Sequence, residues 1–264
     1  MGRIYATHPI TLKSIILFFV LSALAPLPAC SQEAKVVDAS QKTWDSSAHF
    51  IEFSGNILLT NIGFAPLPAF SFDSPIAIVF LSLKKGKFSY EPAFSLGLNG
   101  KPWMIDNWFR YTFIDKKIFA LSAAVNPSLF FKIENENRGK ETIIAQRNLC
   151  FDLSFDYPVS KNIYGEISYQ YVHGFEPGAL SGHILFLGGS ISKLPLSTMI
   201  FIEINPQVFY FDFTGNKDGM FAAAKLNVGD QQLPLKFFLQ GVQRLWSDFN
   251  CSHFKWSFGM IYHF

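Results

Sequence analysis

One short stretch, YVHGFEPGALSGHILF (residues 171–186), gathers side chains that could carry out nucleophilic chemistry. It holds His173, Glu176, Ser181 and His183. A serine becomes a nucleophile when a neighbouring base accepts its proton, and that base needs a third group to orient it. These residue types at this spacing allow a hydrolytic site built from His173, Ser181 and His183. The simpler interpretation is that they are turn and strand-end residues without a catalytic role.

The rest of the sequence carries no motif for a cofactor or a metal ion. It has no Cys-x-x-Cys pair, no His-Glu-x-x-His and no glycine-rich phosphate loop. The LGGS stretch at Leu187–Ser190 follows no helix-forming sequence, so it indicates a strand of small residues. We therefore expect no cofactor and no metal. The sequence does not decide whether Cys150 and Cys251 form a disulfide, because sequence spacing alone cannot place the two thiols.

Composition narrows the class of partner. The chain has 264 residues, of which 49% are hydrophobic and 16% are charged, with a net charge of +2 and thirty phenylalanines. Typical soluble domains carry about 25% charged residues. The weak net charge gives no field that would attract nucleic acid, so we expect no nucleic-acid partner.

The first thirty residues have the features of an export signal. Residues 1–13 contain Arg3 and Lys13 and no acidic residue. The apolar run SIILFFVLSAL follows, and the segment ends in APLPAC. The run is shorter than the roughly 20 apolar residues that a spanning helix needs. We predict a signal peptide over residues 1–30 and a flexible polar lead over residues 31–48. LPAC also resembles a lipobox in which Cys30 would be lipidated, and the alternative is an ordinary signal peptide with a chance cysteine.

From residue 49 onward, large apolar residues alternate with small or polar ones. In 198–210, for example, Ile200, Ile202 and Ile204 alternate with polar residues such as Glu203 and Asn205. A period of two is the strand pattern. The predicted strands have about 10–14 residues, longer than the usual five or six and long enough for the roughly 9–11 of a transmembrane strand.

This pattern predicts an all-β fold: one closed antiparallel transmembrane β-barrel over residues 49–264, with about twelve strands and ten as the alternative. Short turns and longer connections interleave along the chain, which is typical of barrels that cross a bacterial outer membrane. The segments 74–83 and 180–192 alternate poorly. The predicted strands are 49–62, 74–83, 86–98, 102–114, 117–132, 141–156, 162–173, 180–192, 197–213, 219–229, 232–245 and 252–264.

Aromatic residues crowd the predicted strand ends. We expect them to form the girdles that such barrels place at the two membrane–water interfaces. The residues assigned to these girdles are Trp103, Trp108, Tyr111, Tyr157, Tyr210, Phe211 and Phe213.

The chain ends in FKWSFGMIYHF, which resembles the C-terminal insertion signal of bacterial outer-membrane β-barrel proteins. The residues that carry this resemblance are Trp256, Phe258, Met260, Tyr262 and Phe264. It implies an outer-membrane location, contact with outer-membrane lipids and recognition of the last strand by the barrel-assembly machinery. The phrase INPQVFYFDFTGNKDGMF is similar to uncharacterised barrels of Bacteroidetes-like bacteria, a likeness that transfers no functional residue.

The polar face of the strands predicts what fills the barrel. If its charges pair across the lumen, the barrel is plugged, and if they leave a gap, it conducts a small solute. Their mixed sign predicts no ion preference. The predicted lumen-lining residues are Glu91, Asp106, Arg110, Asp152, Glu166, Glu203, Asn205, Gln207, Lys225, Lys236 and Lys255.

Three functions follow from these observations. The first is a non-enzymatic, porin-like barrel with a narrow channel for small solutes. The second is a lipid hydrolase at the barrel rim, of the phospholipase A or lipid A deacylase type, whose His-x-Ser-Asn type of motif this sequence lacks. The third is a barrel subunit of a larger envelope assembly.

Overall fold

The described residues form twelve β-strands. The computed structural model describes residues 50–63, 71–135, 141–215 and 217–264. Among these residues, no helix is long and apolar enough to cross a membrane. The strands are β1 (Glu52–Thr60), β2 (Ile76–Lys85), β3 (Phe88–Gly97), β4 (Pro102–Lys116), β5 (Phe119–Asn135), β6 (Glu141–Ser160), β7 (Ile163–Gly174), β8 (Gly182–Pro195), β9 (Ile200–Phe213), β10 (Lys217–Asp230), β11 (Leu235–Ser247) and β12 (Phe254–His263).

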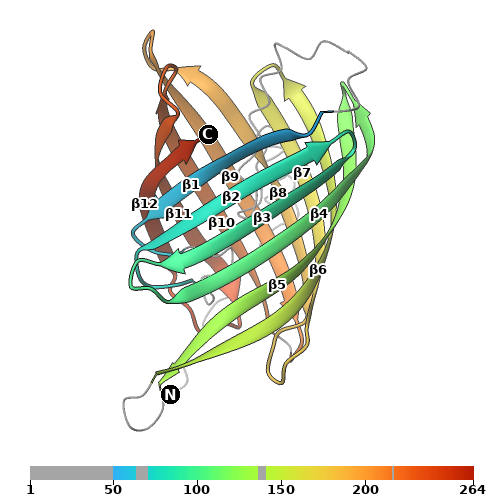
Figure 1. Cartoon of the computed structure of the whole chain (residues 1–264), viewed down its shortest axis with the longest axis vertical. Helices are drawn as coiled ribbons and strands as arrows, with labels where there is room; N and C mark the ends of the chain where they lie inside the picture. Colours follow the sequence, from blue (N-terminus) through green and yellow to red (C-terminus); the bar gives the residue numbers. More distant parts are fainter. Residues whose placement is uncertain (1–49, 64–70, 136–140, 216) are drawn as a thin grey trace, which may run out of the picture.

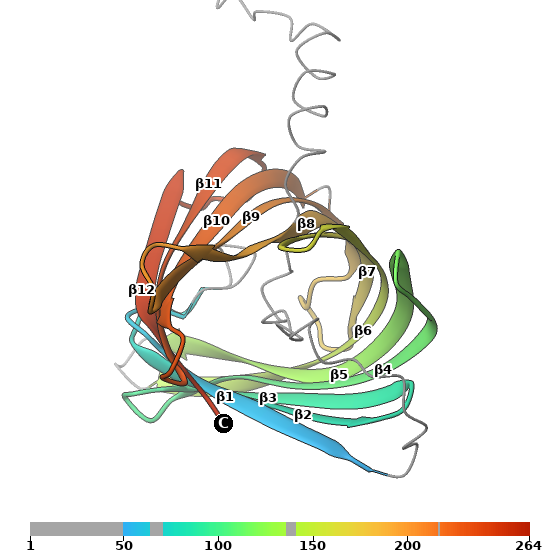
Figure 2. The same cartoon turned by 90° about the horizontal axis from the view of Figure 1, so that it is seen from above.

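The strands close into one antiparallel barrel, as the sequence predicted, and the count is twelve rather than ten. Each strand pairs with the next in the sequence, and β1 pairs with β12. Figure 1 shows the strongly tilted strands, and Figure 2 shows the closed ring from above. Closure satisfies the backbone groups of both edge strands, which in hydrocarbon would otherwise cost several kcal/mol each, roughly.

The connections sort into two ends. Residues 86–87, 117–118, 161–162, 196–199 and 231–234 join strands at what we call the short-turn end. Residues 61–75, 98–101, 136–140, 175–181, 214–216 and 248–253 join them at the loop end. The predicted turns YPVSKN and SKLPLS are shorter than expected, because β6 continues to Ser160 and β8 to Pro195.

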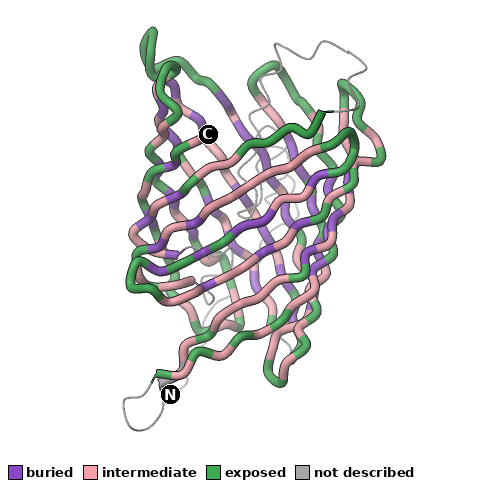
Figure 3. Tube along the Cα trace, in the orientation of Figure 1, coloured by how far each residue is buried: buried purple, intermediate pink, exposed green. Residues whose placement is uncertain are grey.

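Burial alternates along the strands with a period of two, which Figure 3 shows as a change of colour at successive residues. In β6, Cys150, Asp152 and Ser154 are buried and face inward, whereas Phe151 and Leu153 are about half exposed at 48% and 49%. The same contrast recurs on other strands. The outer wall therefore presents large apolar side chains, and most of the buried polar side chains lie inside.

The interior also contains apolar clusters, and these correct part of the girdle prediction. Trp103, Trp108, Phe211 and Phe213 are buried, with exposed fractions of 4% or less, so they do not belong to an outer girdle. Tyr111 remains exposed at 46%. Trp103, Phe211 and Phe213 occupy inward positions near strand ends, where a period-two pattern alone cannot separate a girdle from a core, and Trp108 lies inward near the middle of β4.

Several predictions concern residues outside the described ranges. The signal peptide (1–30), the lead (31–48), Cys30 and the first predicted strand residue, His49, all lie there. The two cysteines that are described, Cys150 and Cys251, are free, so no disulfide joins them.

Candidate functional site

The inner wall formed by β3–β7 carries a hydrogen-bonded cluster around one arginine. Arg110 Nη1 donates to Asp152 Oδ2 at 2.9 Å and also to the hydroxyls of Ser122 and Ser154 at 3.1 and 3.2 Å. Arg110 Nε lies 3.7 Å from Glu91 Oε2. The side chains of Arg110 and Asp152 are only 11% and 2% exposed. Burial without these partners would be costly for either charge, so the cluster is built as a unit.

Asp152 is the main hydrogen-bond acceptor of this cluster. Its Oδ1 accepts hydrogen bonds from Ser168 Oγ and Gln170 Nε2, and its Oδ2 accepts from Ser154 Oγ. Ser154, Ser168 and Gln170 were not among the predicted lumen-lining residues. The period-two pattern could have found them, because they share the inward face of β6 and β7 with Asp152 and Glu166.

Two further acidic residues lie on the same wall. Asp106 is buried, and its Oδ1 accepts a hydrogen bond from Asn126 Nδ2 at 2.8 Å. Glu166 is buried on β7. Among the predicted lumen residues, this wall thus holds the four carboxylates of Glu91, Asp106, Asp152 and Glu166 and one guanidinium, that of Arg110.

The opposite wall, formed by β9–β12, has the reverse balance. Lys236 Nζ donates to Glu203 Oε2 at 3.0 Å and lies 5.6 Å from the centre of the Phe201 ring. Lys225 Nζ lies 4.6 Å from the centre of the Phe238 ring. Such ammonium–ring contacts stabilise a charge that is partly removed from water. Figure 2 shows that β10–β12 lie across the ring from β4–β6.

The remaining predicted lumen residues belong to this second wall. Asn205 Oδ1 accepts a hydrogen bond from Asn227 Nδ2 at 2.8 Å, and Gln207 is buried beside it on β9. Lys255 Nζ donates to Asp73 Oδ1 in the connection between β1 and β2, at 2.9 Å. The predicted lumen residues therefore form two separate groups of opposite charge balance.

Most of the charges lie in the same half of their strands. Asp106 and Lys255 lie in the loop half of their strands. The others lie in the half of their strand nearest the short-turn end: Glu91, Arg110, Asp152, Glu166, Glu203, Lys225 and Lys236. We call these seven residues the charge belt. A belt of this kind can bind or guide small polar solutes and ions, since it offers both signs of charge to the interior.

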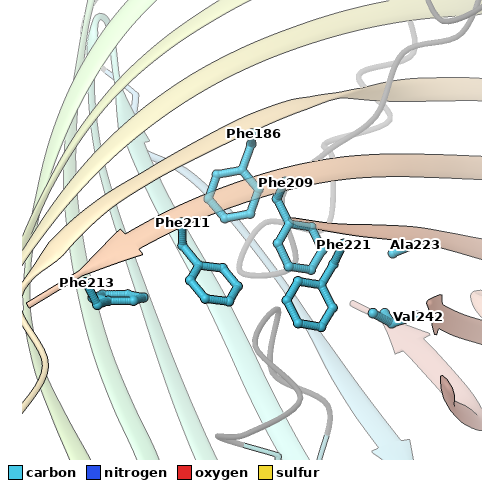
Figure 4. Packing of buried hydrophobic residues seen from close by; sticks show 7 residues of the cluster. All are labelled: Phe186, Phe209, Phe211, Phe213, Phe221, Ala223 and Val242. Atoms are coloured by element: carbon cyan, nitrogen blue, oxygen red, sulfur yellow. The ribbon is translucent and has the colours of Figure 1, made fainter. Parts of the chain in front are cut away.

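Above the charge belt, the loop half of β8–β11 is filled by an aromatic cluster. Its members pack together with centroid distances such as 5.5 Å for Phe209–Phe221 and 5.4 Å for Phe211–Phe221. Phe249, from the connection between β11 and β12, packs on Phe211 at 5.3 Å. Figure 4 shows the seven buried side chains of the aromatic cluster: Phe186, Phe209, Phe211, Phe213, Phe221, Ala223 and Val242. The interior of the barrel is therefore apolar on this side.

The hydrolase candidates lie at the loop end but are not brought into one triad. Ser181 Oγ is 3.5 Å from His173 Nδ1 and accepts a hydrogen bond from the Gly174 backbone N–H at 3.0 Å. His183 instead contacts the Tyr169 hydroxyl through Nδ1 at 2.6 Å. Within the part of the chain that the structure describes, no group of three or more His, Cys, Asp or Glu side chains is arranged to hold a metal ion.

Glu176, the acidic residue of the same stretch, is engaged elsewhere. Its carboxylate accepts hydrogen bonds from Arg147 Nε and from the Arg147 backbone N–H, both at 2.6 Å. The hydrogen bond from Arg147 holds the pKa of Glu176 below its ordinary value. An ionised, arginine-bound Glu176 anchors the 175–181 loop to β6 and does not orient a histidine.

The five residues of the C-terminal pattern all lie on the outer wall of β12 or just beyond it. Their exposed fractions run from 39% for Met260 to 53% for Phe258. The Trp256 and Phe258 rings stack at 5.9 Å, and Tyr262 stacks on Phe264 at 6.5 Å. The terminus is fixed by the paired backbone hydrogen bonds between Gly55 and Phe264, each 3.0 Å long.

The fold and its two faces define the class: a closed twelve-stranded antiparallel β-barrel with an apolar exterior and a charged interior. No model of a known protein family matches the sequence, and no curated protein sequence matches it. Solved structures of similar shape include in-vitro folded OmpT, an outer membrane protein of Vibrio cholerae, with 8% identity, a TM-score of 0.38 and coverage of 85% of this chain and 100% of that chain.

Two other structures have a similar degree of likeness. The beta domain of the Bordetella autotransporter Brka has 8% identity and a TM-score of 0.43, with 81% of this chain and 98% of that chain covered. The outer membrane channel DcaP of Acinetobacter baumannii has 9% identity and a TM-score of 0.35, with 81% of this chain and 97% of that chain covered.

Proposed function

We propose that this protein is an integral barrel of the bacterial outer membrane whose interior passes small polar solutes, without enzymatic activity. The observation that carries the proposal is the contrast between the two faces of the same strands. Half-exposed Phe151 and Leu153 alternate with buried Asp152 on β6. The outer face of the barrel is therefore suited to contact with membrane hydrocarbon. The charge belt offers polar partners to a solute inside.

The loop lengths support an orientation for this barrel. Outer-membrane barrels have short periplasmic turns and longer outside loops. We therefore place the short-turn end and the C-terminus of this chain in the periplasm. The outward row of Trp256, Phe258, Met260, Tyr262 and Phe264 is then the surface that the barrel-assembly machinery reads.

Insertion and conduction are tested separately. The purified chain is refolded into lipid vesicles, and insertion is read as protection from protease and a heat-dependent shift on a denaturing gel. Ile204→Arg places a charge on the outer wall and should destabilise the inserted barrel by roughly 2–4 kcal/mol. Ile204→Phe, an apolar change at the same site, is the control. If Ile204→Arg inserts as well as wild type, β9 does not face lipid and the membrane proposal fails.

Conduction is measured in planar bilayers with the inserted wild-type protein. Steady single-channel openings are the result expected of a solute channel. An inserted barrel that never conducts and never releases a trapped solute from vesicles would refute the channel while leaving the membrane location intact.

A rim hydrolase is the second candidate function, because Ser181 Oγ and His173 Nδ1 lie within 3.5 Å. Its weakness is the missing third group, since Glu176 binds Arg147 and His183 contacts Tyr169. Wild type and Ser181→Ala are compared for release of fatty acid from phospholipid vesicles. Release by wild type that Ser181→Ala abolishes would replace the non-enzymatic proposal, and equal background release would reject the hydrolase.

A further inference from the structure

The outer wall has a groove where β4, β5 and β6 lie side by side near the loop end. Its volume is about 490 Å³, within the roughly 300–1,000 Å³ of small-molecule sites. The lining comprises Asn107, Pro127, Ser128, Leu129, Arg147, Asn148, Leu149 and Phe175. The paired positions Pro127↔Leu149 and Leu129↔Arg147 place the two sides of the groove on neighbouring strands.

The groove coincides with a change in the pairing of β4 with β5. The paired positions run up to Ile105↔Leu129 and begin again at Phe109↔Val125. Pro127 lies in this interval, and proline has no N–H to donate to a ladder. Side chains take over there: the Asn107 backbone N–H donates to Asn126 Oδ1 at 2.7 Å, and Asn107 Nδ2 donates to the Pro127 carbonyl at 3.2 Å.

Polar groups on a lipid-facing wall are costly and point to function. Asn107 shares the outward face of β4 with Phe109 and is held by a third bond, from the Tyr90 hydroxyl to its Oδ1 at 2.8 Å. Arg147 shares the outward face of β6 with Leu149, and its side chain is 70% exposed. The groove therefore combines an apolar floor with one guanidinium at its loop-end margin.

The guanidinium of Arg147 has N–H donors that the described residues do not use. Arginine carries five N–H donors, and among the described residues only Nε is hydrogen-bonded, to Glu176 Oε1 at 2.6 Å. Bidentate donation to phosphate is the interaction that arginine makes best. The position of Arg147 near the loop end corresponds to the level of lipid headgroups if the barrel spans a membrane.

We propose that this groove binds one membrane lipid with an anionic phosphate headgroup. An acyl chain lies against Pro127, Leu129 and Leu149, and the phosphate accepts hydrogen bonds from the Nη groups of Arg147. Glu176 competes with the phosphate for the same guanidinium. The inference rests on the membrane location under the proposed function, but it does not need an open lumen.

The experiment counts lipids retained by the folded barrel. Wild type and variants are refolded in a neutral detergent, checked for the heat-dependent gel shift, and titrated with phosphatidylglycerol or with phosphatidylcholine of the same acyl chains. Native mass spectrometry then reports the fraction of protein that keeps one lipid. Conductance is recorded on the same preparations, so loss of the channel function and loss of the lipid site are read separately.

Two matched pairs of variants separate the site from general folding effects. Arg147→Gln should weaken retention of phosphatidylglycerol about tenfold, the equivalent of one charge-assisted hydrogen bond, whereas Glu176→Gln should retain it as well as or better than wild type. Leu149→Trp fills the groove and should abolish retention, whereas Leu153→Trp, on the same face of β6 outside the groove, should leave it unchanged.

Three outcomes would overturn the proposal. The first is equal retention of the two lipids by wild type. The second is an equal loss in Arg147→Gln and Glu176→Gln, which would show that Arg147 acts only by anchoring the 175–181 loop. The third is normal retention in Leu149→Trp, which would place the bound lipid elsewhere on the wall.

Discussion

The inner wall of β3–β7 and the inner wall of β8–β11 both bury their side chains, but the first does so with hydrogen-bonded polar groups and the second with packed aromatic rings. Both consist of inward side chains at alternate positions of neighbouring strands. On the first, Arg110 and Asp152 draw serine and glutamine side chains into a hydrogen-bonded cluster. On the second, Phe209, Phe211 and Phe221 stack as in the core of a soluble protein. Inward orientation in a barrel thus does not decide whether a position is polar.

The two walls should respond differently to the loss of one side chain. A buried charge is tolerated only when its partners are in place, so removing one charged member of the polar wall should strongly destabilise the barrel. An aromatic cluster gains from area and close packing, so each ring contributes a share and the loss is graded.

The largest effect is expected at the centre of the polar wall. Asp152→Ala leaves the Arg110 guanidinium buried without its main partner and should destabilise the barrel by about 3–5 kcal/mol. The measurement is urea-induced unfolding in vesicles, followed by tryptophan fluorescence. Ser154→Ala, which removes one hydroxyl from the same cluster, should cost about 1 kcal/mol. Equal costs for the two variants would mean that water already replaces Asp152 as a partner.

In the aromatic cluster, Phe211→Ala should destabilise by about 3 kcal/mol, the lower end for a buried phenylalanine, because the barrel mouth can relax. Phe211 has no exposed surface, whereas Phe237 on the outer wall is 58% exposed. Phe237→Ala is therefore the control and should change the unfolding midpoint far less. A Phe211→Ala barrel as stable as wild type would show that the cluster is loosely packed.

Substitutions in the lysine-rich inner wall of β9–β12 should change ion selectivity rather than assembly of the barrel. Glu203→Gln removes the carboxylate that accepts from Lys236 Nζ, so Lys225 and Lys236 are left with less compensation. If the lumen conducts, its reversal potential in a KCl gradient should shift toward anions, and Lys236→Gln should shift it toward cations. Unchanged reversal potentials in both variants would place these charges away from the ion path.

The smallest effect concerns the loop that Glu176 anchors. Because the pKa of Glu176 is lowered from 4.5 by Arg147, the ion pair is complete above that value and is lost only as the pH falls through the lowered pKa. A spin label at Ala179→Cys should therefore keep its mobility from about pH 7 to about pH 5 and gain mobility only in stronger acid. The added change Glu176→Gln should remove the pH dependence. A mobility change centred near neutral pH would contradict the assignment.

The period of two was enough to predict the barrel and its twelve strands, because lipid outside and polar groups inside give each strand two different faces. It was weakest at 74–83 and 180–192, and the structure gives the reason. In β2, Ile76 and Ile78 face an apolar interior cluster while Ala77 and Val79 face outward. In β8, Phe186 joins the aromatic cluster between two outward leucines. Where the interior is apolar, both faces are alike and the pattern disappears.

The charged residues of the cluster were among the predicted lumen residues, but its hydroxyl and amide members and its arrangement were not predicted. Residue types and parity placed Glu91, Arg110, Asp152 and Glu166 on inward faces. Their grouping into one wall depends on the register between strands, which positions Asp152 opposite Ala124 and Gln170. The groove at Pro127 was not predicted at all, because it arises from an interruption between β4 and β5 that neither strand shows alone.

The seam between β1 and β12 should be the last part of the barrel to form as the chain folds. The backbone pairing there runs from Gly55 to Thr60, whereas β5 and β6 pair from Ala120 to Asn135. Every other neighbour is a hairpin of adjacent segments, but the seam joins positions about 200 residues apart, as in the bond from the Thr60 hydroxyl to the Phe258 carbonyl across 198 residues. Contacts so distant along the chain form late, after the entropy of closing the whole loop has been overcome. Closure of this short seam should therefore be the rate-limiting step, with the hairpins assembled first into an open, curled sheet.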